Sequence, residues 1–272
     1  MRELFSYAFM QNAFIAILII SPMLGILGTM VVHKQMAYFS DALGHSALTG
    51  VAIGAILGVT PPNLTMVVFG ILFALLLNRI KFRTKAAVDT VISVCASTAL
   101  AIGLAILSRG SGFSKYSSLL VGDVLSIRRE ELPLLAFSAL LTLVYWGFCL
   151  NSLTAASIHP ALAKSRRIPV RLTEDLFVVI ISILVMLSIR WIGVLLINAL
   201  LILPAASAKN LASNMRQYHV YTVLIALFCG ILGLFVSYCT NVATGPMIVI
   251  YAGIIYFATY LRGTEHAYRR SR

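Results

Sequence analysis

The sequence predicts an all-α protein, a polytopic bundle of about nine transmembrane helices that forms a single transmembrane domain over residues 1–272. Composition supports this prediction: 60% of the 272 residues are hydrophobic, 11% are charged, and the mean hydropathy is +0.95. A soluble domain averages about 25% charged residues, so this chain has too few charged residues to form the water-exposed surface of a soluble protein. A soluble enzyme, a nucleic-acid-binding protein and a disordered scaffold are therefore excluded, although the net charge is +12.

The predicted spans follow from runs of about 20 mostly apolar residues, the length that crosses a bilayer. The first begins in MRELFSYAFMQNAF, where no small-residue cleavage site precedes the apolar run, so we expect a helix and not a removable signal. The last begins at Gly245-Pro246, because proline suits the first turn of a helix. A partly inserted helix at 117–127 leaves eight or ten crossings open. The predicted spans are 5–31, 36–58, 62–78, 86–108, 131–150, 172–190, 192–208, 218–239 and 246–261.

The basic residues predict which side of the membrane each terminus occupies. Nine crossings place the two termini on opposite sides. If the C-terminus is cytoplasmic, 15 of the 21 Lys and Arg residues lie in interior segments and six lie outside. Cytoplasmic loops carry such an excess of basic residues, so a cytoplasmic C-terminus is predicted.

Two ionisable residues, Asp41 and His45, lie within the second predicted span, MAYFSDALGHSALTGVAIGAILG. They are four residues apart and so share one helix face. His45 lies about 16 Å along the axis from Lys34, which is near the middle of a hydrocarbon layer roughly 30 Å thick. Since a charge at that depth costs about 2.5–3.5 kcal/mol, the pair is a candidate functional site.

A carboxylate and an imidazole together suit a divalent transition metal. One chain offers only two such ligands at this depth, whereas a transition metal takes four to six. A twofold dimer that joins two second spans would supply two Asp and two His side chains. The alternative is a structural role, in which Asp41 and His45 bind each other or polar groups inside the bundle.

Other residues in the spans are candidates for helix packing or for the transport pathway. Gly50, Gly54 and Gly58 form a double GxxxG pattern, which predicts close helix packing and leaves a sliding gate as the alternative. Pro204 predicts a kink or break within an apolar run. The candidate pathway residues are Asn198, Pro204, Asp89 and Asp123. The alternative role for Asp89 is to complement the dipole at the start of its helix.

The interior segment 155–170, AASIHPALAKSRRIPV, predicts a short basic helix suited to docking on a partner, or else an ordinary basic loop. No Walker A, HExxH or GxSxG pattern is present, so the chain is not predicted to be an enzyme. The four cysteines form no CxxC pair and are expected to be free thiols. Energy for uphill transport must therefore come from another subunit or from an ion gradient.

The stretch MAYFSDALGHSALTGVAIG (36–54) resembles the signature of the membrane subunits of bacterial zinc and manganese ABC importers, the ZnuB-type metal permeases. The resemblance covers nearly the whole chain, because three further stretches match in order. These are AAVDTVIS (86–93), LLINALLILPAASAKNLA (195–212) and GPMIVIYAGIIYF (245–257).

The resemblance implies the architecture of the vitamin B12-type (type II) importer permease. It implies a homodimer in the bacterial cytoplasmic (inner) membrane, two cytoplasmic ATP-binding subunits that carry the ATP, and an extracytoplasmic metal-binding protein. Asp41 and His45 match the proposed intramembrane metal ligands, and 155–170 matches the ATPase-contacting helix. The docking residues are then His159, Pro160, Ala161, Leu162, Lys164, Arg166 and Arg167. His159 stands where members of this family often have a polar or acidic residue. Arg167 lies near a position where they customarily have glycine.

The sequence therefore predicts the permease of an ATP-driven importer of divalent metal, with zinc favoured and manganese or iron as the alternative. The metal is cargo, and no permanently bound cofactor is expected. A proton-coupled secondary transporter and a structural subunit without substrate are the alternatives of another class.

Overall fold

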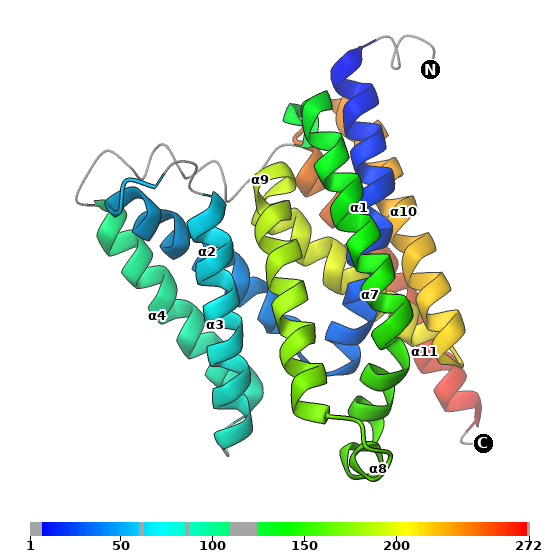
Figure 1. Cartoon of the computed structure of the whole chain (residues 1–272). Coiled ribbons are helices and arrows are strands. Elements are labelled where there is room, and N and C mark those ends of the chain that lie inside the picture. Colours follow the sequence, from blue (N-terminus) through cyan, green and yellow to red (C-terminus); the bar gives the residue numbers. More distant parts are fainter. Residues whose placement is uncertain (1–6, 60–62, 85–86, 109–123, 271–272) are drawn as a thin grey trace. The chain divides into compact units, whose positions relative to one another are not determined.

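The computed structural model describes residues 7–59, 63–84, 87–108 and 124–270, and all regular structure in these ranges is helical (Figure 1). Short 3-10 turns η2 and η3 precede α7, and the six-residue α8 follows it. The elements are α1 (Ala8–His33), α2 (Ala37–Ile56), α3 (Asn63–Arg83), α4 (Val88–Ser108), η2 (Val124–Ser126), η3 (Arg129–Glu131), α7 (Leu132–Ile158), α8 (Pro160–Ser165), α9 (Val170–Leu211), α10 (Met215–Thr240) and α11 (Thr244–Arg270).

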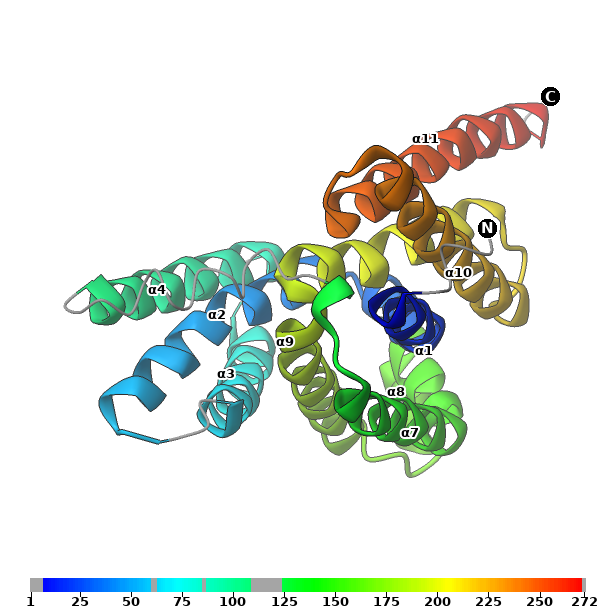
Figure 2. The same cartoon turned by 90° about the horizontal axis from the view of Figure 1, so that it is seen from above.

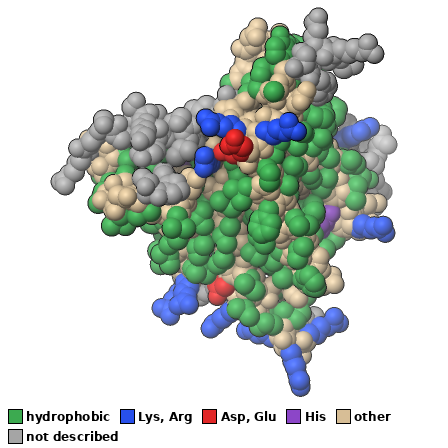
Figure 3. Space-filling model, turned by 45° about the horizontal axis from the view of Figure 1, so that its top comes forward, with side chains coloured by type: hydrophobic (Ala, Val, Ile, Leu, Met, Phe, Trp, Pro, Cys, Tyr) green, Lys and Arg blue, Asp and Glu red, His purple; other side chains and the backbone are tan. Residues whose placement is uncertain are grey.

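The prediction of an all-α transmembrane bundle is confirmed. Within the described residues, seven helices are long and apolar enough to cross a membrane, namely α1, α3, α4, α7, α9, α10 and α11. The polar residues of α2 lower its hydropathy, so α2 is not among the seven. The 42-residue α9 covers both the sixth and the seventh predicted spans. Apolar side chains cover most of the face drawn in Figure 3, as contact with lipid requires.

The break in α9 lies close to the boundary between the sixth and seventh predicted spans, 172–190 and 192–208, and not at Pro204. Within α9 the backbone departs from helical geometry at Gly193, with φ 73° and ψ 165°. Pro204 lies inside the helical part that follows and is buried. The helix is therefore not broken at Pro204, and the predicted kink there stays a prediction. The observed break uses a backbone conformation that is essentially restricted to glycine.

The chain forms two compact units, each assembled from separate segments. Unit 1 comprises Met1–Val32, Asp123–Leu143 and Leu195–Arg272, and unit 2 comprises His33–Gly122 and Val144–Val194. The chain passes from unit 2 to unit 1 directly after the Gly193 break. The expectation of one permease domain over 1–272 stays a prediction.

In unit 1, α1 packs closely against α10 and against the second part of α9. A Cβ on Gly25 would lie 3.3 Å from the Ala226 Cβ of α10, and the Tyr218 hydroxyl donates a 3.2 Å hydrogen bond to the Thr29 carbonyl. Helix α11 packs on α10 (Figure 2). Small side chains allow this approach of backbones, the usual basis of helix association in lipid.

In unit 2, α2 packs against both α3 and α4 (Figure 1). The loop before α2 is joined to α9 by an ion pair between Lys34 Nζ and Glu174 Oε1 at 3.3 Å, in which both side chains are largely buried. Burial lowers the pKa of the Lys34 ammonium, and the Glu174 carboxylate partly offsets this effect. Unit 2 contains the predicted metal ligands.

Candidate metal site

Helix α2 places Asp41 and His45 side by side, as their spacing predicts. His45 Nε2 lies 3.5 Å from Asp41 Oδ2, one helical turn apart. The side chains are 46% exposed for Asp41 and 37% for His45, so neither is enclosed within the chain. A carboxylate and an imidazole therefore share one accessible face of a helix packed within the bundle.

This face opens into a cavity of about 200 Å³ between α2 and α4. Small residues make the space, since Ala42 and Ala96 stand where larger side chains would close it. Ser93 and Ser97, four residues apart on α4, add two hydroxyl groups. The cavity is lined by Tyr38, Asp41, Ala42, His45, Ile92, Ser93, Ala96, Ser97 and Leu100.

The donors that the described residues place at this site are too few to hold a transition metal alone. Nowhere in the described ranges do three or more His, Cys, Asp or Glu residues converge in a way that could hold an ion. His45 Nδ1 is buried and has no hydrogen-bond partner among the described residues, whereas Nε2 faces the carboxylate. Nε2 is thus the nitrogen placed to share an ion with Asp41.

Two glycines of the predicted packing motif set the position of α2. A Cβ on Gly50 would lie 2.8 Å from the Met66 Cα of α3, and a Cβ on Gly54 would collide with the Thr65 side chain. On the α4 side, Thr49 Oγ1 donates a hydrogen bond to the Ala99 carbonyl. Tight packing along this part of α2 holds the helix that carries Asp41 and His45.

Gly58 does not belong to this packing surface. It lies beyond the end of α2 with φ 66°, and a Cβ there would meet nothing within 4 Å. A positive φ favours glycine, so Gly58 shapes the turn after α2. The prediction that Gly58 packs against another helix is wrong, because the helix ends before it.

The four candidate pathway residues have different positions. Asp89, in the first turn of α4, lines a cavity of about 450 Å³ with Tyr38, Thr90, Ser93 and Val94. Since Tyr38 and Ser93 also line the Asp41/His45 cavity, the two cavities adjoin. Asn198 and Pro204 belong to the part of α9 in unit 1. Asp123 lies outside the described residues.

The predicted docking segment contains the short helix α8. Ala163 anchors it, packing with Ala156 and Val170 in a small apolar cluster. His159, Lys164, Arg166 and Arg167 are exposed. Arg167 has φ 59°, a conformation that favours glycine. This agrees with the sequence resemblance, which implies a glycine near this position in the family.

The α4 wall of the cavity was not predicted. Ser93 and Ser97 are exposed hydroxyl residues at i and i+4 in a predominantly apolar helix, and that spacing was the available signal. Tyr38 was missed because nothing in the sequence shows which helix its face of α2 meets.

With seven described helices long and apolar enough to cross a bilayer, the fold is that of a polytopic membrane protein. The sequence profile of the ABC 3 transport family matches residues 6–263, and the chain belongs to this family. It is a permease of the manganese and zinc ABC importer type.

Known proteins similar to the chain include permeases named for each of these metals. The manganese import system permease protein ScaB of Streptococcus gordonii is 26% identical over 271 residues, covering 100% of this chain and 97% of the relative. The high-affinity zinc uptake system membrane protein ZnuB of Haemophilus influenzae is 28% identical over 231 residues, covering 85% and 88%. The solved structure of PsaBC from Streptococcus pneumoniae in complex with Fab is 27% identical, with a TM-score of 0.82, and covers 95% of this chain and 93% of that chain.

Proposed function

We propose that this chain is the permease subunit of an ATP-driven zinc importer in the bacterial inner membrane, and that the ion passes through the Asp41/His45 pair. The observation that carries the proposal is the placement of a carboxylate and an imidazole 3.5 Å apart on an accessible face of α2. Desolvation of ionisable side chains on a membrane helix is costly, so such a pair is by default a functional-site candidate.

Two copies of the chain complete the metal site in this proposal. One pair supplies two donors, and a twofold axis beside α2 supplies two more. The partial exposure of Asp41 and His45 leaves them open to such a partner. The two carboxylates would carry a charge of −2, which an arriving divalent cation neutralises.

The donor set favours zinc over manganese. Zn²⁺ commonly takes four nitrogen and oxygen ligands in a tetrahedron, and two Asp/His pairs provide that number. Mn²⁺ is the second candidate, favoured by the similarity to ScaB. It prefers oxygen ligands, which the Ser93 and Ser97 hydroxyls or water would have to supply.

The driving force in this proposal comes from two cytoplasmic ATP-binding subunits that contact α8 through its exposed basic residues. Arg166 and Arg167 project from the turn after α8 and are suited to an acidic partner surface. An extracytoplasmic metal-binding protein delivers the ion from the other side, and the C-terminus is cytoplasmic.

Uptake into vesicles that contain the intact complex tests the proposal. We expect zinc uptake that requires ATP and the ATP-binding subunit, and competition in which zinc outcompetes equimolar manganese and iron. Preference for manganese would select the second candidate. Uptake driven by a pH gradient without the ATP-binding subunit would overturn the proposal in favour of a secondary carrier.

A further inference from the structure

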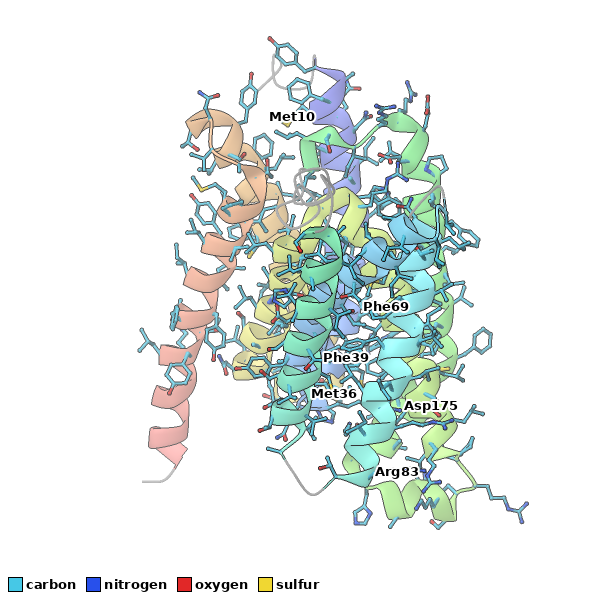
Figure 4. All side chains as sticks on the ribbon, turned by 90° about the vertical axis from the view of Figure 1, so that its left-hand side faces the viewer. Met10, Met36, Phe39, Phe69, Arg83 and Asp175 are labelled. Atoms are coloured by element: carbon cyan, nitrogen blue, oxygen red, sulfur yellow. The ribbon has the colours of Figure 1, made fainter. Side chains whose placement is uncertain are left out.

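A third cavity of unit 2, outside the metal site, is lined by three arginines and one carboxylate among the described residues. Its volume is about 360 Å³ and its lining residues are Arg79 and Arg83 of α3 and Arg171 and Asp175 of α9, called here the basic pocket. Arg79 and Arg83 are four residues apart and share one face of α3. Figure 4 shows Arg83 and Asp175 toward the same end of the helices.

The described residues neutralise the positive charge of the basic pocket only in part. Within the described ranges, none of the three guanidinium groups forms an ion pair with a carboxylate. Asp175 Oδ1 accepts a 2.7 Å hydrogen bond from Asn78 Nδ2, and the nearby Glu174 is paired with Lys34. Three cations against one anion leave a net charge of about +2, so the pocket favours an anion.

The basic pocket lies at the ends of two membrane-crossing helices. The apolar span of α3 ends at Lys81, and that of α9 begins at Val170. Arg79, Arg83 and Arg171 therefore lie where hydrocarbon gives way to lipid headgroups, on the side that the distribution of basic residues predicts to be cytoplasmic. Phosphates are the anions concentrated at that depth.

An apolar ladder on α3 runs along the membrane-crossing span and ends at the basic pocket. Its residues are spaced by four and are all exposed: Leu64 at 63%, Val68 at 49%, Leu72 at 62% and Leu76 at 53%. Leu76 precedes Arg79 by three residues and Arg83 by seven, which places all three on one face. An acyl chain lying on the ladder would bring its own phosphate to the arginines.

We propose that the basic pocket binds the phosphate of an anionic phospholipid, with an acyl chain along the apolar ladder of α3. Guanidinium groups bind phosphate oxygens in bidentate pairs. A net charge of +2 selects a headgroup with net negative charge over a zwitterionic one. This inference is independent of which metal the protein carries.

Lipid binding by the full chain in nanodiscs tests the proposal, with retained phosphatidylglycerol measured by native mass spectrometry against a phosphatidylcholine background. Each of Arg79→Gln, Arg83→Gln and Arg171→Gln is expected to weaken phosphatidylglycerol binding about fivefold, and the triple variant on the order of a hundredfold. Arg262→Gln, at the end of the α11 span, is the matched control and should change nothing.

A substitution of opposite sign protects the test against variants that fold poorly. Asp175→Asn keeps an oxygen to accept the Asn78 hydrogen bond but removes the negative charge, so we expect phosphatidylglycerol binding to tighten about fivefold. Unchanged lipid binding in the triple variant and in Asp175→Asn would overturn the proposal. So would displacement of the lipid by millimolar inorganic phosphate, which would indicate a free-anion site. If the triple arginine variant instead lost the ATP-binding subunit but retained the lipid, the arginines would form a protein contact. That result would also overturn the proposal.

Discussion

The consecutive helices α1 and α2 both pack through glycines and both bury hydroxyl side chains, yet they differ in their ionisable residues. In α1, Ser21 and Thr29 are fully buried, and Thr29 Oγ1 donates to the Ile26 carbonyl of its own helix at 2.6 Å. In α2, by contrast, Asp41 and His45 remain partly exposed beside a cavity. Glycine packing therefore serves as scaffold in both helices, and the accessible ionisable pair distinguishes α2.

The largest expected effect separates transport from folding. Asp41→Asn and His45→Ala remove proposed metal ligands from α2 without disturbing its glycine surface. We expect metal uptake to fall by at least about 100-fold, while the complex stays assembled and still hydrolyses ATP. Uptake into vesicles and size-exclusion chromatography measure the two properties, with the exposed Glu130→Gln of η3 as control. Normal uptake in both variants would remove the proposed difference between α1 and α2.

The scaffold role of α1 is tested by Gly28→Ala. The added Cβ would collide with the Leu201 carbonyl oxygen of α9, and such overpacking costs about 3 kcal/mol when backbone must move. We expect a lower thermal unfolding midpoint in detergent. Gly147→Ala of α7 is the matched control, since its Cβ meets nothing within 4 Å. Equal midpoints for the two variants would show that close packing at Gly28 does not stabilise unit 1.

Two glycines of the same sequence motif are expected to differ. Gly50→Ala places a Cβ 2.8 Å from the Met66 Cα, so it should cost about 1–2 kcal/mol and weaken metal binding by shifting α2. Gly58→Ala meets no neighbour but must adopt φ 66°, a cost of about 1 kcal/mol, with metal affinity unchanged. Unfolding midpoints and zinc titration distinguish them, and weaker zinc binding by Gly58→Ala would contradict the assignment.

The smallest expected effect concerns Asp89, in the cavity that adjoins the metal site. We expect Asp89→Asn to slow uptake about two- to fivefold, because one carboxylate contributes to the local potential that attracts cations. Equilibrium zinc affinity should stay unchanged. If Asp89→Asn lost as much zinc affinity as Asp41→Asn, Asp89 would instead be a metal ligand. If uptake by Asp89→Asn were unaltered, Asp89 would only complement the dipole of α4.

Predictions from local sequence agreed with the structure for the positions of the helices and for the Asp41/His45 pair. Eight of the helices coincide with apolar runs, and the i, i+4 spacing correctly placed Asp41 beside His45. The predicted separation of the sixth and seventh spans at 190–192 adjoins the break at Gly193, whereas the proline signal did not show that the helix continues through Pro204. Gly58 was assigned to packing because a motif does not show where the helix ends.

The order and chemistry of the residues along the sequence alone determined that this protein is a membrane-embedded helical bundle. They also determined that a carboxylate and an imidazole share one face of its second helix. Hydropathy and helical periodicity act over a single segment, so a linear sequence contains them. Only the tertiary structure decided that Ser93 and Ser97 of α4 face this pair, that Gly50 but not Gly58 meets α3, and that Arg171 joins Arg79 and Arg83. Each of these depends on which helix packs against which, and that is set by side-chain fit between segments far apart in the chain.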